Sequence, residues 1–345
     1  MNKLLYPLSL AYSFLSNANR DLKKSEFLPK PVISVGNITW GGTGKTPMVI
    51  ELLEFLIKNK MKPAVLTRGY GRKSSRSVLL QDGAEDVDVA DSGDEPLLIA
   101  RSVPRADIIV GSERYENALK YKNETSPDVY VLDDGFQHWK IERNLDIICV
   151  NAANPFGNGM LIPAGILREK PEEMRRAGII IITNADMVSA ENIAGLEREI
   201  FIYSGRKAVI TEYGSYEYVK TNLREIFDFQ TLKKSKIYAL SGIGFSEGFQ
   251  NSVKKSGLEI EECIKMDDHQ KYDKEKVRAI FKKISGDSCL VITSKDAVKL
   301  HGVMDGEMKE RTAVLKVKPI FKTGKEQWEN AVLKSLQPFW TGTEL

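Results

Sequence analysis

The chain has 345 residues, which exceeds the roughly 250–300 at which a single hydrophobic core usually stops growing, so two domains are expected. Its composition, 42% hydrophobic and 28% charged, is that of a soluble globular protein. Fifty Lys and Arg residues against 47 Asp and Glu residues give a net charge of +3, which is too even to indicate nucleic-acid binding. Three cysteines without a CxxC pair argue against a disulfide framework or a zinc site.

The N-terminal segment is apolar from Leu4 to Leu15 and becomes basic afterwards, with Arg20, Lys23 and Lys24. Its apolar part is shorter than the about 20 residues that span a bilayer, and no convincing signal-peptide cleavage site follows it. Two interpretations stay open on these residues alone. The segment is either a helix packed on the domain or an amphipathic segment in a membrane interface, with its basic end attracted to anionic lipid.

From Pro31 onward, short apolar runs alternate with helical stretches. Runs that are apolar at almost every position are typical of strands buried on both faces, as in a parallel sheet covered by helices. A helix is expected from Thr46 to about Asn59, because its apolar residues recur at helical spacing. The expected strands are 31–35, 63–67, 107–110, 128–134, 145–151, 178–183 and 207–211.

A second series of alternating strands and helices begins near residues 236–244 and continues through 288–296 and 312–321. The domain boundary is therefore expected between about 205 and 235, which predicts three parts: 1–24, 25–215 and 216–345. No low-complexity linker separates the two larger parts, and a cleft between them is the natural place for a binding site.

The stretch ISVGNITWGGTGKTPMV, residues 33–49, lies between an expected strand and an expected helix. It resembles the phosphate-binding pattern G-x-x-x-x-G-K-[ST], except that Thr39 stands at the first glycine position. The loop would bind phosphate oxygens through backbone N–H groups and the helix N-terminus, while the lysine reaches the outer phosphates and the threonine hydroxyl holds Mg²⁺. The alternative is a structural turn with a surface lysine. The candidate nucleotide-binding residues are Gly41, Gly42, Thr43, Gly44, Lys45 and Thr46.

The stretch DVYVLDDGFQH is an apolar strand that ends in Asp133 and Asp134. Ligands of α/β folds bind at the carboxyl edge of the sheet, and a Walker-B strand places a Mg²⁺-supporting carboxylate there. A strand-end Asp that caps the next turn is the alternative. Together with the phosphate loop, the pair is interpreted as a metal-binding element.

Three weaker candidates complete the set. In DSGDEP, Asp94 or Glu95 would act as a base for an incoming hydroxyl or as a metal ligand, although such a pair also occurs in solvated loops. In MDDHQKYD, His269 is a further candidate, with a purely structural role as the alternative. Arginines on loops after strands suit phosphate recognition, as in TRGYGRK, Arg114 and Arg168.

Taken together, these motifs resemble those of the tetraacyldisaccharide 4'-kinases, the lipid A 4'-kinase family. A threonine or serine in place of the first loop glycine is typical of that family. The motifs run in order from residue 35 to 299, so the resemblance covers most of the chain. They are VGNITWGGTGKTP, TRGYGRK, SGDEP, LDDGFQH, NPFGNGMLIPAGILRE, DHQKY and TSKDAVK.

The resemblance implies an enzyme that transfers a phosphoryl group from ATP, with Mg²⁺, to the 4'-hydroxyl of a tetraacyldisaccharide 1-phosphate. The implied fold is a P-loop NTPase-like, mostly parallel sheet covered by helices (25–215), a second, smaller α/β domain (216–345) and an N-terminal membrane-associating helix (1–24). The lipid substrate and the cytoplasmic face of the inner membrane are the implied partners. Neither nucleic acid nor an obligate protein partner is expected.

The resemblance also implies roles for single residues. Asp94 is expected to be the base, paired with His269, while Lys45 stabilises the transferred group. Asp133 and Asp134 match the Walker-B acids, and Thr46 and Glu95 are further candidates for the metal. The expected substrate contacts are Arg68, Tyr70, Arg72, Arg114, Arg168 and Glu169.

The chain departs from the family pattern at two places. The histidine motif often reads Asp-His-His but is DHQ here, and Lys170 stands before Pro171 where the family often has LREP.

Two rival functions also remain: a P-loop kinase of a soluble metabolite, and a GTP-dependent switch or metal-delivery protein. The spacing of TSKD does not match a guanine motif, which argues against the GTP-dependent class.

Overall fold

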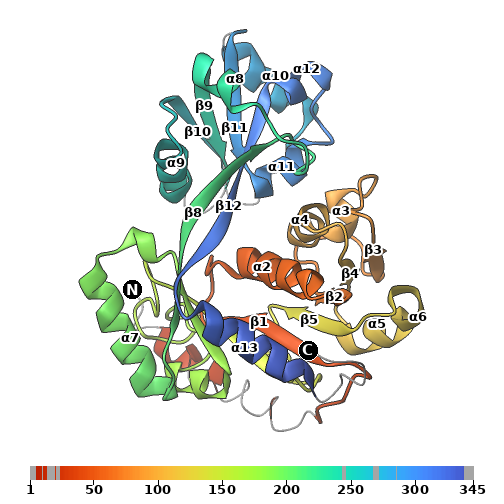
Figure 1. Ribbon diagram of the computed structural model, residues 1–345, viewed down its shortest axis with the longest axis vertical. Coiled ribbons are helices and arrows are strands. Elements are labelled where there is room, and N and C mark those ends of the chain that lie inside the picture. The colour runs from red at the N-terminus through yellow and green to blue at the C-terminus, as the bar shows by residue number, and fades with distance from the viewer. Residues whose placement is uncertain are drawn as a thin grey trace. The chain divides into compact units, whose positions relative to one another are not determined.

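The computed structural model describes residues 5–9, 11–13, 20, 24–242, 246–266, 272–284 and 286–337 (Figure 1). The chain forms two compact units that are each discontiguous in sequence. The first unit consists of Met1–Arg68, Glu113–Tyr213 and Pro319–Leu345, and the second consists of Gly69–Ser112 and Gly214–Lys318. The sequence predicted contiguous parts, whereas in the structure the segment Gly69–Ser112 belongs to the same unit as the C-terminal αβ series.

The first unit is built on a parallel sheet with the strand order β7-β6-β1-β5-β2. Its central strands are buried along their whole length, as the continuous apolar runs predicted. The strands are β1 (Val32–Gly36), β2 (Pro63–Thr67), β5 (Val129–Asp133), β6 (Leu145–Asn151) and β7 (Ile179–Thr183). The long strand β8 (Val209–Val219) begins in this unit, parallel to β7, and continues into the second.

Helix α2 (Lys45–Lys58) follows β1 directly and lies within one residue of its predicted bounds. It buries Met48, Val49, Leu52, Leu53 and Leu56, which recur at helical spacing and form one apolar face. The remaining helical elements of this unit are α5 (Arg114–Lys120), α6 (Lys122–Thr125), η2 (Pro171–Arg176), η3 (Ala185–Met187), α7 (Ala190–Ser204) and α13 (Lys325–Leu336). The fully buried Trp328 of α13 packs its ring 5.0 Å from that of Phe55 in α2.

The second unit contains a parallel sheet with the order β10-β9-β11-β12, which confirms the second αβ series. Its strands are β9 (Lys236–Ser241), β10 (Ile260–Lys265), β11 (Ser288–Thr293) and β12 (Thr312–Thr323), and β12 continues into the first unit. The predicted strand at 107–110 is β4 (Asp107–Val110), which pairs antiparallel with a strand that was not predicted, β3 (Val78–Leu80). The helices are α3 (Val89–Ser92), α4 (Asp94–Ser102), α8 (Phe229–Lys234), α9 (Ser246–Lys255), α10 (Lys274–Lys283), α11 (Ser294–Leu300) and α12 (Gly306–Glu310).

The described part of the N-terminal segment packs on the first unit. Residues 6–9 and 11–13 are helical. The Ser9 hydroxyl donates to the Leu161 carbonyl at 2.9 Å, and the Tyr12 hydroxyl donates to the Arg168 carbonyl at 3.2 Å. Among the residues that the structure describes, no helix combines the length and the apolar character needed to cross a membrane. Membrane contact by residues 1–24 therefore stays a prediction.

Candidate active site

The loop between β1 and α2 is shaped by left-handed glycines and by side chains from neighbouring strand ends. Gly41 has a φ of 116° and Gly44 a φ of 75°, which only glycine adopts without strain. Thr183, the last residue of β7, donates its hydroxyl to the Thr43 carbonyl at 3.0 Å. Asn151, the last residue of β6, donates to the Gly42 carbonyl at 3.0 Å. The carboxyl ends of two parallel strands therefore hold the glycine-rich loop.

The departure from the standard loop pattern has a structural reason. Thr39, which replaces the first glycine, is buried and forms an antiparallel bridge with Leu167. The Trp40 N–H donates to the Ile166 carbonyl at 2.6 Å, and the Arg168 N–H donates to the Ile38 carbonyl at 2.7 Å. A β-branched residue suits such extended pairing better than glycine does. Residues 166–168, which follow NPFGNG in the sequence, thus hold the start of the loop through backbone hydrogen bonds.

The two acidic residues after β5 differ in environment. Asp133 is 5% exposed and accepts a hydrogen bond of 2.9 Å from the Thr67 hydroxyl at the end of β2. Burial, together with the neighbouring Asp134, raises the pKa of Asp133. Asp134 is more exposed and lies 3.5 Å from the Lys45 ammonium and 2.8 Å from the Arg168 guanidinium. Although burial alone would raise it, Lys45 and Arg168 hold the pKa of Asp134 at about 2.

Among the described residues, cations outnumber ionised carboxylates around Asp134. The buried Arg114 donates to the Asp134 carbonyl at 3.2 Å, and burial lowers the pKa of Arg114 while the two aspartates oppose that shift. Arg168 also donates to the Asn37 side-chain oxygen at 3.2 Å. Lys45, Arg114 and Arg168 therefore surround one carboxylate that is fully charged, beside another whose ionisation burial disfavours. Such an excess of positive charge suits a phosphate ligand.

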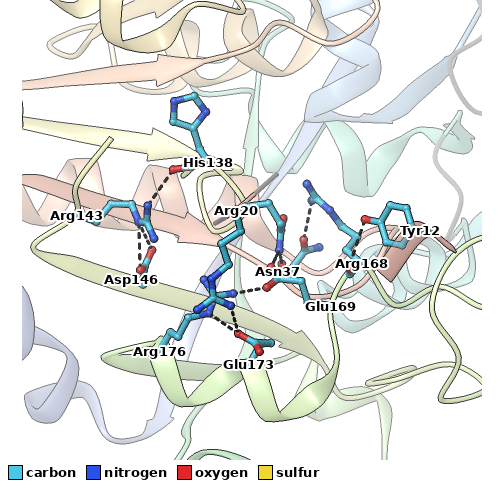
Figure 2. A network of polar contacts seen from close by, with 11 residues as sticks. Tyr12, Arg20, Asn37, His138, Arg143, Asp146, Arg168, Glu169, Glu173 and Arg176 are labelled. Atoms are coloured by element: carbon cyan, nitrogen blue, oxygen red, sulfur yellow. Dashed lines mark hydrogen bonds and ion pairs between the residues drawn. The ribbon is translucent and has the colours of Figure 1, made fainter. Parts of the chain in front are cut away.

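Glu169, next to Arg168 in the sequence, lies in a network of polar contacts (Figure 2). It is 9% exposed, accepts from the Gln137 amide at 2.6 Å and pairs with Arg176. Arg176 stacks 4.0 Å from the centre of the Phe136 ring and also pairs with Glu173, which binds Arg20 at 2.9 Å. These contacts of Glu169 with Gln137 and Arg176 fix the backbone next to Arg168. The predicted contact of Glu169 with the substrate stays a prediction.

Asp94 lies in the second unit as the first residue of α4, and its side chain is 10% exposed. The TRGYGRK loop packs beside it, because a Cβ added at Gly69 would meet the Ser92 carbonyl oxygen at 2.9 Å. Tyr70 is 69% exposed, whereas Arg72 donates to the Arg76 carbonyl of its own loop at 2.7 Å. Two lysines of α11 lie near the Asp94 carboxylate.

The predicted residues thus fall into two groups. Lys45, Asp133, Asp134, Arg114 and Arg168 come together in the first unit, with Gly41 to Thr46 in the loop. Arg68, also in that unit, is close enough to lower the pKa of Arg114. Asp94, Glu95, Tyr70 and Arg72 belong to the second unit. His269 lies outside the described residues.

Sequence reasoning missed the residues that support the site. Asn37 donates to the Thr43 hydroxyl at 2.9 Å, and Gln137 donates to the Asn37 carbonyl at 2.8 Å. Both lie inside motifs quoted above, NITWGG and DDGFQH, so the available signal was a polar residue next to a phosphate-binding motif. Asn151 and Thr183 were available as polar residues at the ends of apolar strands.

The chain is similar to proteins of one family over nearly its whole length. The family model described as tetraacyldisaccharide-1-P 4'-kinase matches residues 1–337. A protein named tetraacyldisaccharide 4'-kinase from Geobacter sulfurreducens is 34% identical over 321 residues, covering 92% of this chain and 87% of its own. One from Syntrophus aciditrophicus is 37% identical over 302 residues, covering 82% and 78%.

A solved structure agrees with these relatives. The crystal structure of LpxK from Aquifex aeolicus in complex with ATP has a TM-score of 0.78 to this chain at 28% identity. The match covers 97% of this chain and 99% of that one.

Proposed function

The chain belongs to the tetraacyldisaccharide-1-P 4'-kinase family, and we propose that it transfers the γ-phosphoryl group of ATP to the 4'-hydroxyl of a tetraacyldisaccharide 1-phosphate in lipid A biosynthesis. The observation that carries this proposal is the cluster of Lys45, Arg114 and Arg168 around Asp134, beside the glycine-rich loop. Phosphoryl transfer depends mostly on positioning and on stabilisation of charge, which such a cluster supplies.

The loop and its cations bind and orient the phosphates of ATP. Backbone N–H groups of Gly41 to Thr46 and the N-terminus of α2 favour phosphate oxygens. The Lys45 ammonium, now 3.5 Å from Asp134, is available to the outer phosphates as a mobile charge. Arg168 adds a second cation whose backbone is fixed to the loop through Ile38. Lys45 and the loop N–H groups offset the charge that develops on the transferred group.

The residues present fit the Mg²⁺ that the family implies. The charged Asp134 carboxylate and the Thr46 hydroxyl are hard oxygen donors of the kind that Mg²⁺ prefers. Among the described residues, no group of three or more His, Cys, Asp or Glu side chains could hold a metal. That suits an ion that takes one or two carboxylates and obtains its other ligands from phosphate and water. When bound, the ion neutralises charge on the phosphates.

Asp94 is the proposed general base. A sugar hydroxyl is a weak nucleophile, and a carboxylate within hydrogen-bond reach accepts its proton in the transition state. Asp94 has a fixed backbone position at the start of α4, where the helix N-terminus stabilises a negative charge. His269, proposed as its partner, lies outside the described residues.

Exposed apolar side chains of the N-terminal segment and of the loop support a lipid as the substrate. Leu5, Tyr6 and Leu8 are 38%, 52% and 56% exposed, and Trp40 at the loop is 64% exposed. We assign peripheral contact with the cytoplasmic face of the inner membrane to this apolar surface. Arg20 pairs with Glu173 and stacks on Trp139, so it stabilises the fold and the predicted attraction to anionic lipid falls to the other basic residues.

The proposal is tested by ATP-dependent phosphorylation of the disaccharide 1-phosphate lipid in mixed micelles. Radiolabel from γ-phosphate should appear in the lipid with the wild-type protein. ATP hydrolysis without labelled lipid would contradict the proposed acceptor and favour a soluble sugar or another metabolite. GTP used in preference to ATP would favour the GTP-dependent class instead.

A further inference from the structure

Two lysines of one helix meet the proposed base. In the second unit, the ammonium groups of Lys295 and Lys299 lie 3.7 Å and 3.6 Å from the same oxygen of Asp94, Oδ2. The two residues are four apart on α11, so they share one face of that helix. Their side chains are only 20% and 10% exposed, which distinguishes them from solvated surface lysines.

The distances indicate pairing of charges rather than direct hydrogen bonds. Charge-assisted hydrogen bonds between ammonium and carboxylate groups are about 2.7–2.9 Å long, shorter than either separation here. The two contacts therefore fix the carboxylate by charge. The other oxygen, Oδ1, accepts from the Glu95 N–H at 3.1 Å.

Among the described residues, charge in this cluster is balanced. Lys295 also lies 3.9 Å from the Glu95 carboxylate, so two lysines face two acids. A phosphate-binding site would show an excess of cations, as the cluster around Asp134 does. The lysines therefore match a role in holding a carboxylate and not one in binding a phosphate.

Helix α11 is itself rigidly anchored between the two lysines. Asp296 is fully buried and accepts from the Thr293 hydroxyl at 2.7 Å, the Gly242 N–H at 3.1 Å and the Tyr272 hydroxyl at 3.1 Å. These bonds join two distant segments of the second unit, at Gly242 and Tyr272, to the first turn of α11. The lysines thus extend from a helix whose first turn is hydrogen-bonded to two other segments of the second unit.

We propose that Lys299 and Lys295 are positioning residues that hold and orient the Asp94 carboxylate for proton transfer. The inference rests on the proposed function. In the transfer, the 4'-oxygen forms its bond to the γ-phosphorus as the bond to ADP breaks, and the hydroxyl proton moves to Asp94. The lysines touch neither reactant and act through the carboxylate. The motif TSKDAVK supplies both of them.

The test compares Lys299→Met, Lys299→Arg and Lys295→Met with the wild type in the lipid phosphorylation assay. Lys299→Met should lower kcat by about tenfold or more, part of what a general base contributes, with the KM for ATP changed less than about twofold. Lys299→Arg should retain more activity than Lys299→Met, because it keeps the charge. Lys283→Met, on an exposed residue of α10, is the matched control and should leave kcat unchanged.

A double-mutant cycle separates positioning from mere stability. If Lys299 acts through Asp94, Lys299→Met should have no further effect on kcat in an Asp94→Asn background. An equal loss in both backgrounds, or an unchanged kcat in Lys299→Met and Lys295→Met, would overturn the proposal. Thermal unfolding identifies a variant that fails to fold, in which case Lys299→Arg and Lys295→Met decide. A wild type that does not phosphorylate the lipid overturns the proposed function itself.

Discussion

The loop cluster of the first unit and the Asp94 cluster of the second unit are built on opposite balances of charge. Around Asp134, the cations Lys45, Arg114 and Arg168 exceed the carboxylates, and burial disfavours ionisation of Asp133. Around Asp94, two lysines face two acids within the part of the chain that the structure describes. An excess of cations favours a bound anion, whereas a balanced cluster holds its own carboxylate in place. The first arrangement suits the phosphates and the second suits a base.

The two clusters also differ in what fixes them. Backbone bonds to the 160–169 segment and side chains at the ends of β6 and β7 hold the loop. Side chains of a helix far away in the sequence hold the Asp94 carboxylate. Substitutions should therefore affect nucleotide binding in the first unit and turnover in the second.

The largest effect is expected for Asp94→Asn. Loss of the base should lower kcat for lipid phosphorylation by about 10²-fold or more, because general-base catalysis contributes that much. The KM for ATP should stay within about twofold, since Asp94 is not part of the loop cluster. The matched control is Asp91→Asn, on an exposed residue of the preceding helix, which should leave kcat unchanged. A large rise in the KM for ATP would break the division of roles.

Arg168→Met should affect nucleotide binding more than turnover. It removes the cation that lies 2.8 Å from Asp134 and contacts Asn37, so the KM for ATP should rise by about tenfold, consistent with the loss of a charge-assisted contact. Steady-state kinetics over a range of ATP concentrations measures this. Arg175→Met changes an exposed arginine nearby and serves as the control. An unchanged KM would remove Arg168 from the anion-binding cluster.

Thr39→Gly restores the standard glycine spacing and should nevertheless weaken the protein. It removes a buried β-branched residue from the bridge to Leu167 and adds backbone freedom, which costs about 0.5–1 kcal/mol. The melting temperature should fall by about 1–4 °C. Thermal unfolding with and without ATP shows the effect. A higher melting temperature would mean that the threonine is not required by the pairing.

The smallest effect is expected at His301 in the second unit. Burial lowers its pKa to about 4, with Lys309 and Arg101 adding to the shift while Glu85 opposes it, and its ring bonds to the Thr221 hydroxyl. The folded protein keeps this ring neutral, whereas the unfolded chain binds a proton below the ordinary pKa. Stability is therefore lost as the pH falls from about 6.5 to 4.

His301→Gln should reduce that acid-dependent loss. Between pH 7 and pH 5, the melting temperature of the variant should drop less than that of the wild type. The two drops should differ by no more than about 4 °C. Thermal unfolding at the two pH values measures the difference. Identical drops in both proteins would contradict the role of His301.

The sequence predicted the parts of the fold that follow from local pattern. Continuous apolar runs predicted the parallel strands, and the glycine-rich junction predicted the loop before α2. It did not predict the partner of Thr39, because Leu167 pairs with it from a distant segment. The sequence likewise did not predict that Gly69–Ser112 belongs to the second unit, because this depends on tertiary packing.

The same limit applies to the site. Lys45, Asp133 and Asp134 could be predicted because motif spacing places them at one sheet edge. The contacts of Lys295 and Lys299 with Asp94 could not be predicted, because the motif TSKDAVK does not indicate that its helix, α11, packs next to α4. Their role becomes visible only when charges from distant segments lie within 4 Å of each other.

The most direct test of the account is to measure ATP affinity and lipid turnover together in Lys45→Met and Asp94→Asn. Isothermal titration with ATP gives the first quantity, and labelled lipid gives the second. Both variants should lose lipid phosphorylation, Lys45→Met should bind ATP more weakly, and Asp94→Asn should bind ATP as the wild type does. Weakened ATP binding in Asp94→Asn, or full turnover in either variant, would contradict it.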